Sequence, residues 1–363
     1  MKIHRLKMKI ILILLLPIIL LVREFLYYNP ALTEKLYSRS LYPNIGKLLS
    51  NISGLLPVSI AELLLYAFIV AILIILVIFI YKLIKSRHKL QTTLNAIINT
   101  VCTVSIAYCL FLLLWGFNYY RQPLSYSIGY TPSKSTVADL KGLCSTLIDK
   151  TNLLRSEVKE NAAGVMYLEG GFNGAANRAD KGYQTLSSTF PIFKGTYGRP
   201  KGILLSRQLC YTGIAGIYFP FTGEANVNKL VPDFMLPSTI SHEMAHQRGF
   251  AREDEANFIA YLVCKAHIDV DFQYSGYLLA TIYSMNAMHE YDIESYKELS
   301  AKYSEGLRRD LKYHFDFWKQ FEGPVEKLQE KVNDTYLKSN KQTDGIYSYG
   351  RMVDLLLAEY RSR

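Results

Sequence analysis

Two histidines and a glutamate fall in a spacing that suits a metal centre. His242 and His246 are four residues apart, with Glu243 directly after the first, in the pattern His-Glu-x-x-His. Side chains four positions apart project from one face of an α-helix, so both imidazoles could occupy adjacent corners of a tetrahedral Zn²⁺ site. Glu243 lies about 100° further round the helix, where it could take a proton from a water that zinc activates. The spacing predicts a catalytic Zn²⁺ site with Glu243 as its general base.

The residues around this motif predict one helix with a defined start and end. Pro237 suits the first helical position, and Gly249 suits the left-handed residue that follows a helix. The alternative is an ordinary amphipathic helix with two exposed histidines, and the ordered start and end argue against a chance motif.

A catalytic Zn²⁺ site needs a third protein ligand and leaves a fourth position open. Arg252 stands ten residues after His242, which excludes a third histidine at that spacing. Acids instead open the next expected helix, 253–266. Acids in a first turn also favour the helix dipole, which would explain one or two of the three. We expect Glu253 to be the third ligand, with Glu255 as the alternative.

Substrate binding and stabilisation of the oxyanion would need further residues. A strand expected over 213–220 precedes the metal helix, and its edge could pair with an extended peptide; an ordinary sheet strand is the alternative. The strand residues concerned are Gly213, Ile214, Gly216, Ile217 and Tyr218. A helper for the oxyanion is also expected, and the sequence does not rank the candidates His289, Tyr291, Tyr347, Tyr349 and Arg351.

Three apolar stretches predict transmembrane helices, at about residues 8–28, 60–81 and 96–117. The first is short and reaches across only by continuing through Arg23 and Glu24, but it lacks the small-residue cleavage pattern of a signal peptide. Short basic segments precede the first span and connect the other two, which places both in the cytoplasm if the chain crosses three times. Their residues are Lys2, Arg5, Lys7, Lys9, Lys82, Lys85, Arg87 and Lys89. We therefore expect a multi-pass cell-membrane protein with a cytoplasmic N-terminus and an extracytoplasmic C-terminal domain.

The 363 residues divide into an expected membrane anchor, 1–120, and an expected domain, 121–363. Helical periodicity dominates the domain, and short strands are expected at 202–206 and 213–220, so the fold class is α+β and rich in helix. The formal net charge of +10 gathers largely beside the apolar stretches, and no nucleic-acid-binding pattern is present. Five cysteines without a paired spacing argue against a disulfide framework and against a cysteine metal site.

Several segments resemble a family of bacterial membrane proteins known as domain of unknown function 3810. They are KGILLS, YTGIAGIYFPFTGEANVN, HEMAHQRGFAREDEANF, NDTYLKSN and SYGRMVDLLL, together with the three-span N-terminus and the segment after it. The resemblance covers nearly the whole chain and implies a likeness to gluzincin metallopeptidases, hence a zincin-like fold, zinc, a glutamate as third ligand and peptide-bond hydrolysis. The gluzincin pattern Glu-x-x-Ala matches Glu253 to Ala256, although many gluzincins place this glutamate much further from the second histidine.

These observations predict a membrane-anchored, zinc-dependent metallopeptidase at the outer face of the cytoplasmic membrane. Its partners would be the lipid bilayer and a peptide or protein substrate of the cell envelope. The alternative is a membrane receptor or assembly factor that binds zinc without catalysis. A purely structural membrane protein with a chance motif is a further alternative, and the intact Glu243 favours the enzyme.

Overall fold

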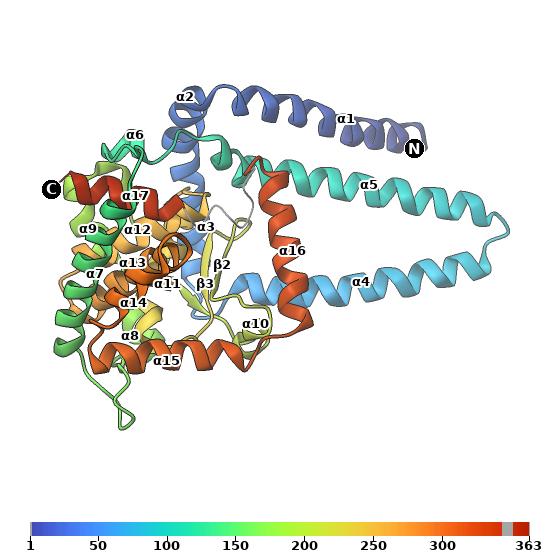
Figure 1. The fold of residues 1–363 in the computed structure, drawn as a ribbon. Coiled ribbons are helices and arrows are strands. Elements are labelled where there is room, and N and C mark those ends of the chain that lie inside the picture. Colours follow the sequence, from blue (N-terminus) through green and yellow to red (C-terminus); the bar gives the residue numbers. More distant parts are fainter. Residues whose placement is uncertain (1, 343–350, 363) are drawn as a thin grey trace.

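The computed structural model describes residues 2–342 and 351–362, and it shows a helical domain from which long helices project (Figure 1). α4 (Ile60–Lys85) and α5 (Lys89–Leu114) form a hairpin that extends from the domain, and α1 (Lys2–Tyr27) runs beside α5. α4 and α5 are each long and apolar enough to cross a membrane. Residues Leu12–Tyr27 of α1 meet this criterion of length and hydropathy only together with Pro30–Gly54, and the two segments are bent by 106° relative to each other. The described part of the chain thus has two or three helices that are candidates for crossing a membrane, which indicates a membrane protein. The number of crossings and their direction remain predictions.

The segment between α1 and α4 folds onto the domain. It contains α2 (Pro30–Thr33), the π-helix η1 (Glu34–Leu41) and α3 (Tyr42–Gly54). The buried Tyr42 hydroxyl lies 3.0 Å from the hydroxyl of Tyr218, and Ser59 donates a hydrogen bond of 2.7 Å to Asn226 Oδ1. The expected boundary at residue 120 therefore assigns residues 30–59 to the membrane anchor, although they pack on the domain and form hydrogen bonds with it.

The start of α4 is bonded directly to the sheet of the domain. The backbone N–H groups of Ile60 and Ala61 donate to the two carboxylate oxygens of Glu224 at 3.0 and 2.7 Å. These are among the N–H groups that a helix N-terminus leaves without a partner inside the helix. The Glu224 carboxylate therefore fixes where the apolar hairpin leaves the domain.

Three short strands form the sheet of the described chain, in the order β1 (Lys201–Gly202), β3 (Glu224–Val227), β2 (Gly216–Phe219). β1 is parallel to β3 and β2 is antiparallel to it, so β2 lies at an edge. The strand expected over 213–220 is present as its second half.

The strand expected over 202–206 is largely wrong. Ile203 N still donates to the sheet at Val227, but the next two N–H groups, of Leu204 and Leu205, donate to the Glu62 carboxylate at 2.9 and 2.8 Å. The backbone therefore leaves the sheet for α4 and turns into α10 (Ser206–Cys210).

Four long helices form the centre of the domain: α7 (Val137–Glu157), α11 (Leu236–Gln247), α12 (Glu253–Ala266) and α13 (Val270–Tyr291). α11 packs on α12, α12 on α13 and α13 on α7, and the residues between them are fully buried. The remaining elements are η2 (Gly116–Tyr120), α6 (Ser125–Ile128), α8 (Gly171–Arg178), α9 (Asp180–Thr189), η3 (Pro191–Phe193), η4 (Asp233–Met235), α14 (Ile293–Ser300), α15 (Glu305–Lys319), α16 (Pro324–Ser339) and α17 (Arg351–Arg361). The helix-rich fold with a few strands is confirmed.

Candidate metal centre

The expected metal helix is α11, which begins at Leu236 with Pro237 in its first turn. Gly249 follows the helix with a φ of +88°, the left-handed region that favours glycine. A Cβ at this position would also lie 2.7 Å from the Tyr42 ring. Gly249 thus allows both the turn that sends the chain back towards α12 and the close approach of the segment before α4.

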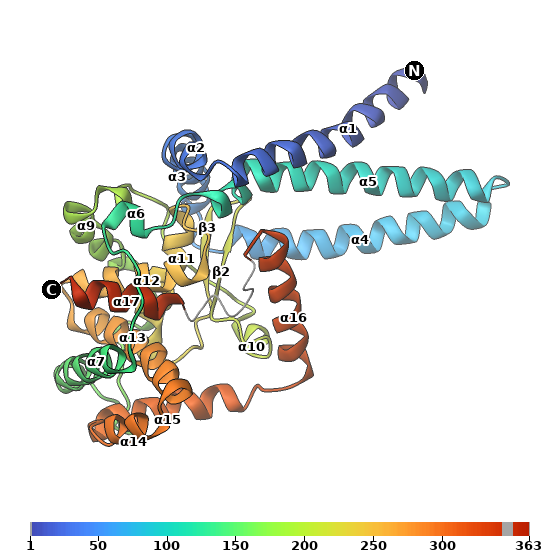
Figure 2. The ribbon, with the colours of Figure 1, turned by 45° about the horizontal axis from the view of Figure 1, so that its top comes forward.

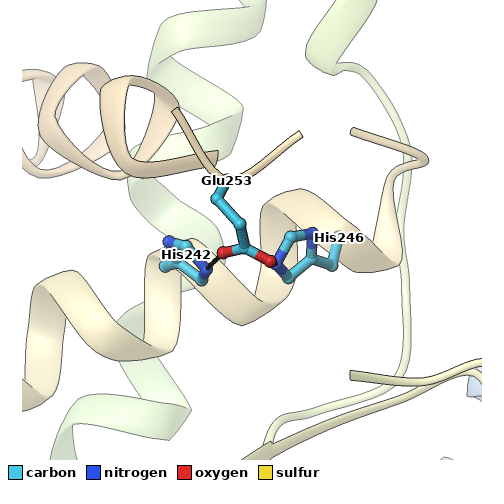
Figure 3. Close-up of side chains that lie close together, drawn as sticks. All are labelled: His242, His246 and Glu253. Atoms are coloured by element: carbon cyan, nitrogen blue, oxygen red, sulfur yellow. Dashed lines mark ion pairs between the residues drawn. The ribbon is translucent and has the colours of Figure 1, made fainter. Parts of the chain in front are cut away.

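Three side chains from α11 and α12 converge (Figure 3). His242 Nε2 lies 3.2 Å from Glu253 Oε2, and His246 Nε2 lies 3.6 Å from Glu253 Oε1. The potential ligand atoms of all three residues lie within 4.8 Å of one another. Four ligands at the usual zinc distances would stand about 3.3 Å apart at the corners of a tetrahedron. The two separations from Glu253 and the donor set of two nitrogens and one oxygen therefore fit Zn²⁺.

Each imidazole is held by a hydrogen bond on its other nitrogen. His246 Nδ1 donates to the carbonyl of Phe250 at 2.7 Å, and His242 Nδ1 lies 2.8 Å from Asn257 Oδ1. Asn257 Nδ2 in turn donates to the hydroxyl of Tyr283 at 3.1 Å. Such contacts fix the ring orientation and leave Nε2 free for a metal. Asn257 follows Glu253 by four residues on α12, so helical spacing alone could have identified it.

The charges at this centre favour a bound cation. Burial alone would lower the pKa of His246, but the carboxylates of Glu253 and Glu243 outweigh burial and raise that pKa to about 9. Burial alone would raise the pKa of Glu253, but both imidazoles hold it well below its usual value. The Glu253 and Glu243 carboxylates thus favour positive charge at the imidazoles, which a proton on His246 or a divalent ion would supply.

Glu243 lies beside this cluster and outside the set of potential ligands. It is 4 % exposed, its Oε2 has no hydrogen-bond partner among the described residues, and burial raises its pKa to about 7. Gly216 of β2 faces it, and a Cβ there would lie 2.4 Å from Glu243 Oε1. The glycine therefore lets the edge strand approach the carboxylate that was expected to be the general base.

The geometry distinguishes Glu253 from Glu255, the two acids that the sequence left as alternatives for the third ligand. Glu255 is turned away from the histidines: its Oε1 accepts hydrogen bonds from Leu124 N at 2.8 Å and from Arg252 Nη1 at 2.9 Å. Glu253 faces both imidazoles. Of the two acids, only Glu253 is thus brought to the imidazoles, and Glu255 connects α12 to the segment that follows the apolar hairpin.

A cavity of about 960 Å³ opens over the cluster. Its wall includes Phe111 from the last turn of α5 and Trp115 just beyond it, as well as β2 and α16. The Trp115 ring lies 5.9 Å from the His246 ring, centre to centre. The candidate metal centre thus lies directly at one end of a helix able to cross the membrane.

Three of the expected oxyanion helpers, His289, Tyr291 and Arg351, do not line this cavity. Tyr291 is 73 % exposed, His289 packs edge-on against Tyr296, and Arg351 Nε lies 3.5 Å from Asp254 on another side of the domain. These three candidates were wrong because α13 and α17 direct them elsewhere. Tyr347 and Tyr349 lie outside the described residues.

Three tyrosines that the sequence did not single out line the cavity instead: Tyr119, Tyr283 and Tyr336. Burial raises the pKa of each, and the nearby Glu253 carboxylate raises it further, so all three keep their protons at neutral pH. The hydroxyls of Tyr283 and Tyr336 accept hydrogen bonds from Asn257 and Tyr119, so their own protons remain available to the cavity, whereas Tyr119 uses its proton in the bond to Tyr336. With 28 tyrosines in the chain, no local pattern marks these three.

The family model for "Protein of unknown function (DUF3810)" matches residues 37–357. The chain belongs to this family. Searches among curated proteins and among solved structures found no match. The region matched by the DUF3810 model includes both α4 and α5 as well as the candidate metal centre, so the apolar hairpin and the cluster are parts of one family unit.

Replacing Glu253 and Glu255 separately by glutamine should show whether either carboxylate holds a metal. We expect Glu253→Gln in the full-length protein to weaken Zn²⁺ binding by more than about 10–100-fold, the loss typical of disturbing even a supporting contact. Glu255→Gln, the matched control on the same helix, should bind Zn²⁺ as the wild type does. Zinc content and titration calorimetry measure this, and equal affinity of both variants would contradict the assignment.

Proposed function

We propose that this DUF3810 protein is a membrane-anchored, zinc-dependent metallopeptidase of zincin-like fold that hydrolyses peptide bonds at the outer face of the cytoplasmic membrane. The observation that carries the proposal is the joint placement of His242, His246 and Glu253 around one point. Beside them lies the buried Glu243 carboxylate, whose Oε2 has no hydrogen-bond partner among the described residues. A structural zinc site has no need of such a carboxylate, because all its positions are filled by ligands.

The ligand residues and the base would have separate tasks. His242, His246 and Glu253 would hold Zn²⁺, which when bound polarises a peptide carbonyl and lowers the pKa of water. Glu243 would accept the proton of the attacking water and deliver it to the leaving amine. Burial raises its pKa to about 7 when no cation is bound, and a bound Zn²⁺ would lower that pKa and favour the carboxylate form that accepts the proton.

The edge strand β2 offers backbone groups for an extended substrate. Asn228 N donates to Ala215 O at 2.9 Å, and the register continues with Ile217 opposite Asn226. In an antiparallel pair these partners alternate with residues whose N–H and C=O point away. Gly216 and Tyr218 would therefore present theirs to a peptide that adds to the sheet.

Tyr283 and Tyr336 are the candidates for stabilising the oxyanion, because Tyr119 donates its proton to Tyr336. Each is a neutral donor in the cavity wall, as such a group must be. Tyr283 is also linked to His242 through Asn257, so its hydroxyl is held by the same network that orients a ligand.

The test uses the full-length protein in lipid nanodiscs and a peptide library analysed by mass spectrometry. We expect cleavage that is lost on chelation, restored by Zn²⁺ and absent in His246→Ala. Bound Zn²⁺ without cleavage would contradict the peptidase and favour a zinc-binding receptor or assembly factor. Absence of zinc binding would contradict both.

A further inference from the structure

α16 carries an apolar stripe that the domain does not cover. Val325, Leu328 and Val332 are 54 %, 64 % and 60 % exposed, and their spacing of three and four residues places them along one face of the helix. Contiguous exposed apolar residues of this kind mark a surface that contacts a protein or a membrane.

The neighbouring face of α16 belongs to the metal-site cavity. Gln329, Glu330 and Asn333 line it, together with Tyr336 of the last turn. The Tyr336 hydroxyl accepts a hydrogen bond of 3.0 Å from Tyr119, and its ring packs 6.3 Å from that of Phe111 in α5. α16 therefore forms a wall of the cavity, and its last turn contacts the domain end of the apolar hairpin.

The position of α16 relative to α4 and α5 indicates what covers its stripe. In both views α16 runs across the direction of these two helices, beside the turns where they join the domain (Figures 1 and 2). A helix across the direction of the spans lies along the membrane plane. The exposed apolar surface of α4 begins at Leu63 and continues along the helix, so lipid around the hairpin would extend to α16.

We propose that α16 lies in the headgroup region of the bilayer, with Val325, Leu328 and Val332 turned towards the acyl chains. An amphipathic helix in this position buries its apolar face at the boundary between headgroups and acyl chains. Its charges do not select a sign of lipid, because Lys327, Lys331 and Lys338 are balanced by Glu326, Glu330 and Asp334. The lipid contact therefore rests on the apolar stripe. α16 forms one wall of the cavity, and it would contact lipid whether or not the metal centre is catalytic.

The experiment measures the depth of single labels on α16 in the full-length protein in nanodiscs. Cysteine replaces Leu328, Val332 or Lys327 in turn in a Cys109→Ser background and is labelled with bimane. The Cys109→Ser protein itself gives the background, since the remaining Cys102, Cys144, Cys210 and Cys264 are buried. The quenchers are lipids with a nitroxide near the headgroup and aqueous iodide. Leu73→Cys in the middle of α4, where the side chain is 56 % exposed, is the lipid-facing control.

We expect the nitroxide lipids to quench labels at Leu328→Cys and Val332→Cys several-fold more than the label at Lys327→Cys, and iodide to show the reverse order. Equal lipid quenching at the three positions, or stronger iodide quenching at Leu328→Cys, would overturn the proposal. Neither readout depends on bound zinc or on hydrolysis, so its failure is distinct from that of the peptidase proposal.

Discussion

Replacing Glu243 by glutamine is expected to lower kcat for peptide hydrolysis by about 10²–10⁴-fold, the usual contribution of a general acid–base group. Glutamine keeps the shape of the side chain but cannot accept the proton. Glu243 is not among the potential ligand atoms, so zinc content should remain at the wild-type level. The measurement pairs kcat on a cleaved library peptide with zinc stoichiometry on the same preparation.

The matched control is Glu330→Gln, which neutralises another carboxylate that lines the same cavity from α16. This variant should keep kcat within a few-fold of the wild type. Wild-type turnover by Glu243→Gln would remove the proposed base, whereas a loss of zinc together with activity would show that Glu243 serves the metal instead.

Breaking the buried pair between Arg121 and Glu34 is expected to destabilise the protein by about 3–5 kcal/mol. Arg121 donates to the Glu34 carboxylate at 2.7 and 2.9 Å and to the carbonyl of Gly249 at 2.8 Å. Both side chains are almost inaccessible, at 3 % and 5 %. Arg121→Met would leave the carboxylate buried with a weaker partner, and the loss would appear as a lower unfolding temperature of the full-length protein in micelles.

Arg39→Met is the matched control, because Arg39 bonds the same carboxylate at 2.8 Å but is 52 % exposed. Its loss should cost less than about 1 kcal/mol, as for exposed ion pairs. The double variant Arg121→Met with Glu34→Gln should recover part of the stability, since no charge then remains buried alone. Equal effects of Arg121→Met and Arg39→Met would contradict the assignment.

The helix that carries the histidines could be read from local sequence, because its start, its end and its side-chain spacing depend on nearby residues. α12 likewise occupies the expected range, Glu253–Ala266. The convergence of Glu253 on the histidines follows from one turn at Gly249. These features need only short-range geometry, which periodicity and helix-end residues report well.

The parts that the sequence did not reveal depend on contacts between distant segments. Glu34 and Arg121 are 87 residues apart, and Tyr119 meets Tyr336 across 217 residues. β3 is four residues long and is defined by its pairing with β1 and β2. Neither a buried pair nor a short strand leaves a periodic pattern in its own segment.

The junction between Glu224 and α4 has a consequence for biosynthesis. The ribosome makes residues 30–59 before Arg121, which closely follows the apolar hairpin, and makes both the segment and the hairpin long before Glu224 and Asn226, which complete their hydrogen bonds. Until Arg121 is made, Glu34 lacks its main partner, and until Glu224 is made, the N–H groups of Ile60 and Ala61 lack theirs, although Ser59 already caps Glu62 N. If α4 and α5 both cross the membrane as predicted, residues 30–59 would therefore remain solvated on the side on which the late residues emerge, and folding would finish only after both helices had been inserted.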